Sequence, residues 1–198
     1  MIRFEFWPTI AFAGLMISWF AFVVVFMVWK KPPSPPDTKR ERKSIIGIAL
    51  QGCAYAIAWI IRRPWFTPFV PASTPVVIAL SILTIALAAA SVWLSASAIN
   101  TLGKQWSLAA RLIEGHKLVT EGPYNMVRNP IYTGMFGMLI VSSMAHGHWL
   151  GLIIASFVYY LGTVMRIKSE EKLLREQFGS EYDDYTREVP AFIPIRLR

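Results

Sequence analysis

The chain has few charged residues and a single cysteine. Only 16% of its 198 residues are Asp, Glu, Lys or Arg, whereas 55% are hydrophobic. Soluble domains carry about 25% charged residues, so this composition excludes an ordinary soluble domain. Cys53 alone cannot form an internal disulfide, and within an apolar run a packing role is favoured over a reactive thiol. The sequence therefore predicts an integral membrane protein.

Several functional signatures are missing as well. No G-x-G-x-x-G stretch follows a strand, which argues against a soluble Rossmann-type methyltransferase domain. His146 and His148 form an H-x-H pair without a third ligand nearby, so we predict no metal site. Although the net charge is +8, no compact basic face for nucleic acid remains once the apolar runs are placed in the membrane.

Gaps between charged residues predict the membrane spans, because a helix needs about 20 apolar residues to cross about 30 Å of hydrocarbon. Charge-free runs cover residues 7–29, 45–61, 75–98 and 129–165. The last run suits two short helices, with Pro130 in the first turn and a bend near 145–148. We predict an all-α polytopic membrane protein of about five transmembrane helices, the last two forming a helical hairpin, with a cytoplasmic C-terminal helix and tail.

The distribution of basic residues predicts the orientation. If the loop at 30–44 is cytoplasmic, 17 of the 20 Lys and Arg residues lie on that side, and Arg3, Arg62 and Arg63 lie outside. The positive-inside rule then favours an external N-terminus and a cytoplasmic C-terminus. The first run is also longer than the core of a typical signal peptide and no small-residue cleavage site follows it, so we expect it to be retained.

The polar residues divide the chain into two parts. Residues 1–99 contain three predicted spans and a Pro-rich basic loop at 30–44, which its prolines keep from becoming helical. Residues 100–198 contain a polar loop, two spans and a C-terminal helix. Most polar residues that do more than solvate the surface follow Asn100. We therefore expect any chemistry to lie in the second part.

The segment 114–134, EGHKLVTEGPYNMVRNPIYTG, is polar although it borders an apolar run. Its G-P pair is a turn signal, and the residue before the proline of N-P is biased away from helix. Irregular backbone at membrane depth is tolerated where it is buried in protein or lines a cavity. Two interpretations stay open: a ligand-binding loop, or a turn in which Arg128 contacts headgroups while Tyr124 and Tyr132 join the interfacial aromatic belt.

A second polar group lies at the end of the last apolar run. Arg166 and Glu170 are four residues apart, so on one helix they lie about 40° apart and can pair, whereas Glu171 points away. A surface pair contributes only about 0–1 kcal/mol, and the segment is alternatively a plain amphipathic tail. Ionisable residues beside the membrane tend to face a cavity or a partner. A functional site is therefore favoured for Arg166 and Glu170 and is evenly balanced for Glu171.

The order of these motifs resembles the isoprenylcysteine carboxyl methyltransferase family and the related phospholipid N-methyltransferases. Over about residues 100–194 the chain contains H-x-L-V-T-x-G-P-Y-x-x-V-R-[HN]-P-x-Y-x-G, two apolar runs, R-x-x-x-E-E and F-G-x-x-Y-x-x-Y. In that family the C-terminal half binds S-adenosyl-L-methionine at the cytoplasmic face, and a lipophilic substrate enters from the bilayer. The resemblance implies the same cofactor here, with a lipophilic or lipidated substrate and membrane lipids as partners.

The resemblance also implies site residues. Arg128 and Arg166 would lie near the reacting carboxylate, with Glu170 as their catalytic neighbour. The cofactor-binding residues that it implies are His116, Leu118, Val119, Gly122, Pro123, Tyr124, Asn129, Tyr132, Glu170 and Glu171. The commonest form of the family has histidine in place of Asn129. An asparagine forms hydrogen bonds but does not titrate. If the histidine of relatives acts as an acid or base, that role is absent here; if it only binds the cofactor, Asn129 can substitute.

The favoured reaction is O-methylation of a carboxylate on an isoprenylcysteine-like or other lipid acid. A carboxylate nucleophile needs no base, and a planar arginine fork is suited to holding it. Phospholipid or amine N-methylation is the alternative, because the motifs leave the acceptor atom open. Two further alternatives are an NADPH-dependent enzyme similar to the membrane sterol reductases and a non-catalytic membrane scaffold. The sterol reductases are longer chains with more spans, so 198 residues and five spans count against the first alternative. A scaffold or transporter would be expected to carry its polar residues in mid-span, which counts against the second.

Overall fold

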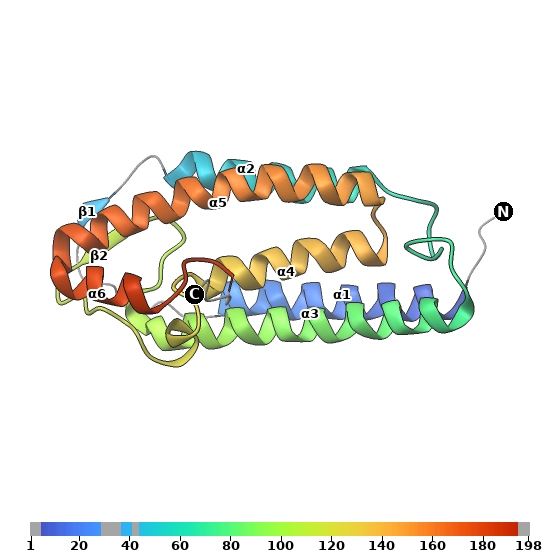
Figure 1. The fold of residues 1–198 in the computed structure, drawn as a ribbon, viewed down its shortest axis with the longest axis horizontal. Coiled ribbons are helices and arrows are strands. Elements are labelled where there is room, and N and C mark those ends of the chain that lie inside the picture. The colour runs from blue at the N-terminus through green and yellow to red at the C-terminus, as the bar shows by residue number, and fades with distance from the viewer. Residues whose placement is uncertain (1–4, 29–36, 41–43, 194–198) are drawn as a thin grey trace.

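A computed structural model describes residues 5–28, 37–40 and 44–193, which form a bundle of six α-helices (Figure 1). The predicted all-α class is thereby confirmed, and most of the predicted basic loop at 30–44 lies outside the described residues. The helices are α1 (Phe6–Val28), α2 (Ser44–Ile60), α3 (Thr74–Leu102), α4 (Pro130–Ala145), α5 (Trp149–Phe178) and α6 (Ser180–Glu188).

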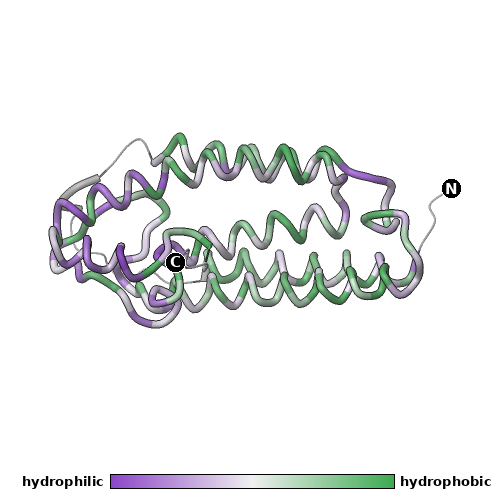
Figure 2. Tube along the Cα trace, in the orientation of Figure 1, coloured by the Kyte–Doolittle hydropathy of each residue, from purple (hydrophilic) through white to green (hydrophobic). Residues whose placement is uncertain are grey.

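Five of these helices are apolar and correspond to the five predicted spans. By length and composition α1, α3 and α5 are able to cross a membrane, whereas α2 and α4 are shorter apolar helices of 17 and 16 residues. At 1.5 Å per residue the two shorter helices are about 25 Å long. The 30 residues of α5 make it about 45 Å long, so its C-terminal part extends beyond the other helices into a polar end of the molecule (Figures 1 and 2).

The helices lie along one direction in two groups. α2 packs along α5, and α1, α3 and α4 form the second group (Figure 1). The chain alternates between the two ends of the bundle, so the segments after α1, α3 and α5 gather at the same end. Hydrophilic residues concentrate at that end, and hydrophobic residues cover the helices (Figure 2). This distribution is that of an integral membrane protein whose polar end projects from the bilayer.

The predicted hairpin of the last two spans is confirmed. α4 begins at Pro130, where a missing N–H and a fixed φ suit the first turn of a helix. His148 accepts a hydrogen bond at Nδ1 from the backbone N–H of Leu150 and so caps the start of α5. His146 is buried beside the rings of Trp59 and Trp65. Both histidines of the H-x-H pair therefore have packing or capping contacts.

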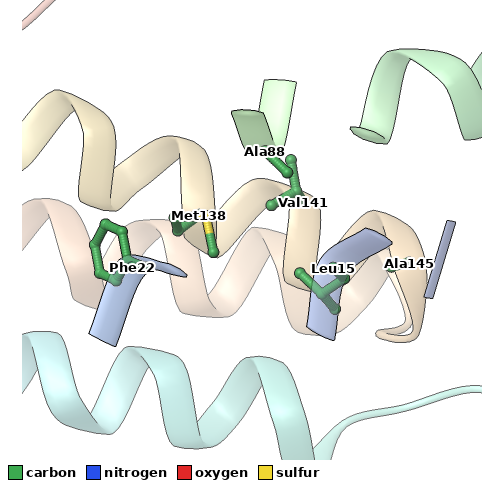
Figure 3. Close-up of a cluster of buried hydrophobic side chains, with 6 residues drawn as sticks. All are labelled: Leu15, Phe22, Ala88, Met138, Val141 and Ala145. Atoms are coloured by element: carbon green, nitrogen blue, oxygen red, sulfur yellow. The ribbon is translucent and has the colours of Figure 1, made fainter. Parts of the chain in front are cut away.

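Apolar side chains from both predicted parts of the chain form a common core. Figure 3 shows a cluster to which α1, α3 and α4 contribute. Its buried members are Leu15, Phe22, Ala88, Met138, Val141 and Ala145. A second cluster joins Ala54 and Ala58 of α2 to Leu139 of α4 and Tyr159 of α5. The halves 1–99 and 100–198 thus pack on each other, and their division by function stays a prediction.

Short irregular elements close the polar end. β1 (Asp37–Arg40) pairs antiparallel with β2 (Arg111–Ile113), and two 3₁₀ turns, η1 (Gly103–Gln105) and η2 (Gly122–Asn125), bracket the segment that contains β2. The β1–β2 pair fastens part of the segment between α1 and α2 to the loop between α3 and α4.

The predicted packing role of Cys53 is wrong, because the side chain is exposed on the surface of α2. An apolar run cannot distinguish a lipid-facing side from a packed side, since both are hydrophobic. Gln51, two residues earlier on the same helix, is buried instead.

Candidate functional site

A cavity of about 140 Å³ lies at the polar end of the bundle. Its wall is built from the last turns of α1 and α3, the segment 105–119, the start of α4, the C-terminal part of α5, and α6. Because α5 extends beyond the bundle, its polar residues face this wall and not the hydrocarbon. Packing of the helices thus brings the polar segment 114–134 next to the polar C-terminal part of α5, although α4 and the apolar part of α5 lie between them in the sequence.

Ten of the twelve predicted site residues line the cavity. They are His116, Leu118, Val119, Tyr124, Arg128, Asn129, Tyr132, Arg166, Glu170 and Glu171. The other two, Gly122 and Pro123, belong to η2 and are not among the lining residues. The structure therefore assembles most of the predicted set in one place, and the binding role of each residue stays a prediction.

Gly122 and Pro123 instead shape the turn that delivers Tyr124 to the cavity. Gly122 has a φ of +59°, a conformation that favours glycine, and a Cβ there would lie 3.0 Å from Oγ1 of Thr101. Pro123 is buried. The backbone carbonyl of Tyr124 accepts a hydrogen bond of 2.6 Å from the hydroxyl of Tyr185. This turn thus joins the loop to α6 as well as to the end of α3.

Arg166 is held in place by neutral groups. Its side chain is buried, and it donates from Nη1 to Oε1 of Gln51 at 2.8 Å and from Nη2 to the carbonyl of Leu108. The guanidinium carbon lies 4.6 Å from the centre of the Tyr132 ring, which is within cation–π distance. Its buried Nε has no hydrogen-bond partner within the part of the chain that the structure describes.

The predicted ion pair between Arg166 and Glu170 is wrong, since none of the ion pairs among the described residues joins them. Tyr132, from α4, contacts both groups. Its hydroxyl donates a hydrogen bond to Oε1 of Glu170, and its ring faces Arg166. Helical spacing placed both residues on one side of α5 correctly, but it could not show that a tyrosine from another helix would contact both of them.

Arg128 has a different set of partners from the one that the resemblance implies. Its Nη2 forms an ion pair of 2.9 Å with Oε1 of Glu171, and its Nη1 donates to the backbone carbonyls of Thr186 and Val189. The guanidinium therefore joins α5 to the end of α6. Although Arg128 lines the cavity, most of its donors are already occupied by the protein.

Further hydrogen bonds attach the C-terminal segment to the start of α4. The backbone N–H of Arg128 donates to the carbonyl of Pro190, and Nδ2 of Asn129 donates to the carbonyl of Ala191 at 2.7 Å. Thr133 donates its hydroxyl to the carbonyl of Phe192. Asn129 thus uses its amide as a donor to backbone in this structure, which is a role that needs no proton transfer.

The tyrosines of the cavity wall outside the spans are held neutral. Burial raises the pKa of Tyr124 well above its usual value, with a further rise from the charge of Glu170. Burial also raises the pKa of Tyr185 to about 12. Both phenols keep their protons at physiological pH, so they offer hydroxyl groups and ring faces but no negative charge.

His116 lies in the segment after β2, and its Nδ1 is a buried atom that has no hydrogen-bond partner among the described residues. Burial lowers the pKa of the imidazole, and the nearby positive charge of Arg111 lowers it further. The neutral form therefore predominates at pH 7. A neutral ring leaves a nitrogen lone pair or N–H that a ligand can use, without adding positive charge.

The lowered pKa predicts a direction for acid sensitivity. The unfolded chain binds a proton at His116 near pH 6.5, whereas the folded chain binds it only at lower pH, so protonation favours unfolding. We expect the melting temperature of the wild type relative to His116→Gln to fall as the pH is lowered from 7.5 to 5, with most of the change below about 6.5. Thermal unfolding in detergent measures it. A difference that is constant across this range, or that rises towards acid pH, contradicts the prediction.

Several lining residues were missed. Trp106, Leu108 and Arg111 come from the segment after α3 and precede His116, where the motif pattern begins. Tyr182 and Tyr185 also line the cavity. Their spacing in F-G-x-x-Y-x-x-Y was part of the family pattern, so that motif was a signal that could have assigned them to the site.

Comparison with known proteins identifies the family of this chain. The phospholipid methyltransferase family matches residues 79–181, which is just over half of the chain. The chain belongs to the phospholipid methyltransferase family. The region matched to the family includes most of α3, the cavity loop, α4 and α5, but it does not include α1 or α2.

Curated relatives of this family member match about half of the chain. A protein-S-isoprenylcysteine O-methyltransferase of Schizosaccharomyces pombe is 34% identical over 104 residues, which cover 52% of this chain and 44% of the relative. An Arabidopsis thaliana protein-S-isoprenylcysteine O-methyltransferase B is 32% identical, with 52% and 53% covered. The nickel-cobalt-cadmium resistance protein NccN of Alcaligenes xylosoxydans xylosoxydans is 40% identical over 98 residues, with 48% and 44% covered. The chain spans about half the length of these relatives.

Proposed function

We propose that the protein is a membrane-embedded S-adenosylmethionine-dependent methyltransferase that esterifies the carboxylate of a lipophilic acid. Family membership supports methyl transfer, and Arg166 supports the choice of acceptor. Its guanidinium lines the cavity, is buried, and has the neutral Gln51 amide and Leu108 carbonyl as its hydrogen-bond acceptors. No carboxylate of the described residues forms a direct ion pair with it, so an anionic group of a ligand can approach the guanidinium without displacing one.

The lining residues fit the proposed cofactor. The unpartnered Nδ1 of His116 is a buried polar atom that a ligand can satisfy. The neutral rings of Tyr124 and Tyr185 offer apolar faces suited to an adenosine group. The carboxylates of Glu170 and Glu171 lie on the same cavity wall. Glu171 is already paired with Arg128, so we assign attraction of the cofactor's positive charge to Glu170.

When bound, S-adenosylmethionine supplies a methyl group whose carbon accepts an electron pair from a carboxylate oxygen as the carbon–sulfur bond breaks, leaving a neutral thioether and a methyl ester without proton transfer. The protein residues therefore contribute alignment and exclusion of water. Arg166 holds the anionic acceptor in one orientation, since its planar fork matches a carboxylate. Tyr132 fixes Glu170 through its hydroxyl, and its ring packs against the guanidinium of Arg166.

Transfer of a radiolabelled methyl group tests this function. The purified protein in lipid nanodiscs is mixed with methyl-labelled S-adenosylmethionine and N-acetyl-S-farnesylcysteine, which is a prenylated thioether acid. We expect label in the lipid fraction that alkali releases as volatile methanol, because methyl esters hydrolyse. Label transferred to phosphatidylethanolamine and stable to alkali would support N-methylation instead, and no transfer to either would count against the proposed activity.

We further propose that the cavity faces the cytoplasm, which rests on the basic residues that share its end of the bundle. Ser180 begins α6 at that end, and Ser73 precedes α3 at the other end; both are exposed. In a Cys53→Ala background, Ser73→Cys should react with an impermeant thiol reagent in intact cells, whereas Ser180→Cys should react only after lysis. The reverse pattern would invert the proposed orientation.

A further inference from the structure

α2 lies outside the region that matches the family, yet it contacts the site. Gln51 is its only amide side chain and is 2% exposed. Its Oε1 accepts the hydrogen bond from Nη1 of Arg166 at 2.8 Å, and its Nε2 donates to Oγ1 of Thr163 at 2.9 Å. Since a guanidinium only donates, these partners determine which end of the amide faces Arg166.

The backbone of the α2–α5 pair is built for this contact. Gly47 and Gln51 are four residues apart on α2, and Gly162 and Arg166 are four apart on α5, so each pair shares one side of its helix. A Cβ on Gly47 would lie 2.5 Å from Cγ of Arg166 and 2.7 Å from the carbonyl oxygen of Gly162. A Cβ on Gly162 would lie 2.8 Å from the carbonyl oxygen of Gly47. The two glycines thus allow the close helix approach that the Gln51–Arg166 hydrogen bond requires.

We infer that Gln51 is a positioning residue for methyl transfer: it orients the guanidinium of Arg166 towards the acceptor and, because it is uncharged, it adds no negative charge at hydrogen-bond distance from that guanidinium. A glutamate at position 51 would have nearly the same shape and would still accept the hydrogen bond. It would also place a negative charge 2.8 Å from Arg166. Charge and geometry can therefore be separated at this position.

Two substitutions separate these contributions. Gln51→Glu keeps the acceptor atom but neutralises Arg166, so we expect the KM for an acidic acceptor to rise by about tenfold or more with a smaller change in kcat. Gln51→Met keeps the length and apolar volume but removes the acceptor, so Arg166 keeps only its hydrogen bond to Leu108 and is oriented less strictly. We expect kcat to fall by about tenfold. Gln51 does not line the cavity, so affinity for S-adenosylhomocysteine should be unchanged in both variants.

The experiment uses the full chain in nanodiscs, with N-acetyl-S-farnesylcysteine as the varied substrate. Calorimetric titration with S-adenosylhomocysteine is run on the same preparations. Cys53→Ser, on the exposed surface of the same helix, is the matched control and should behave as wild type. Wild-type KM and kcat in both Gln51 variants would overturn the inference. So would a loss of S-adenosylhomocysteine affinity that parallels the loss of turnover, since that is the effect of a general packing defect.

The inference rests on the proposed function, and the wild type distinguishes the two failures. A wild type that binds S-adenosylhomocysteine but does not methylate the farnesylated acid overturns the carboxylate function, and the role of Gln51 with it. A wild type that methylates the acid, together with unaffected Gln51 variants, overturns the positioning role alone.

Discussion

Arg166→Ala should reduce kcat/KM for a carboxylate acceptor by about 10²–10³-fold, the range seen when one preorganised donor is removed from a reaction centre. The substitution removes a buried cation from the cavity wall, together with its hydrogen bonds to Gln51 and Leu108. Since the cofactor is positively charged at its reactive end, removal of this cation should not weaken cofactor binding. We therefore expect S-adenosylhomocysteine affinity to be preserved while turnover is lost.

The measurement combines methyl-ester formation with calorimetric titration on the same preparation. Arg187→Ala is a suitable control, because Arg187 is exposed and pairs with Asp184 on the surface of α6. It should retain wild-type turnover. An Arg166→Ala protein that turns over the acid at the wild-type rate would remove the basis for a carboxylate acceptor.

The second large effect concerns stability and follows from Arg128. Its ion pair with Glu171 is mostly buried, with side-chain exposures of 12% and 20%. Removing one partner of a buried pair leaves an uncompensated charge and costs about 3–5 kcal/mol. Arg128→Ala also leaves the carbonyls of Thr186 and Val189 without these hydrogen bonds. We expect a clear fall in melting temperature and faster proteolysis between residues 179 and 193.

Arg175→Ala is the matched control for this prediction. Arg175 also joins α5 to α6 through a carboxylate, Asp183, but the two side chains are 51% and 45% exposed. An exposed pair contributes only about 0–1 kcal/mol, so the control should remain near wild type in both assays. If Arg128→Ala is as stable as Arg175→Ala, Arg128 does not fasten the C-terminal segment, and its proposed place beside the substrate regains support.

Much of the fold could be predicted because the bilayer imposes a strong constraint. Charge-free runs gave helices close to the observed ones: the run 75–98 lies inside α3, and 45–61 nearly coincides with α2. The division of 129–165 into two helices was also predictable, because Pro130 suits a first helical turn. The exposed surface of α2 at Cys53 was not, since lipid and protein interior are both apolar.

The sequence predicted which residues line the cavity better than it predicted which residues they contact. The order of the motifs identified ten of the lining residues, whereas their hydrogen-bond and ion-pair partners depend on contacts between helices. Tyr132 contacts both Arg166 and Glu170 because α4 packs beside α5, and no spacing within α5 contains that information. Gln51 was overlooked for the same reason: one amide in an apolar run has no visible partner until α2 is packed against α5.

The central claim is that the cavity binds a methyl donor, and ligand titration tests it most directly. Purified full-length protein is titrated calorimetrically with S-adenosylhomocysteine and, separately, with NADPH, and the first titration is repeated on Tyr124→Ala. We expect saturable binding of S-adenosylhomocysteine that is weaker in Tyr124→Ala, and no binding of NADPH. Binding of NADPH alone would indicate a reductase, and binding of neither ligand by folded protein would contradict the methyltransferase account.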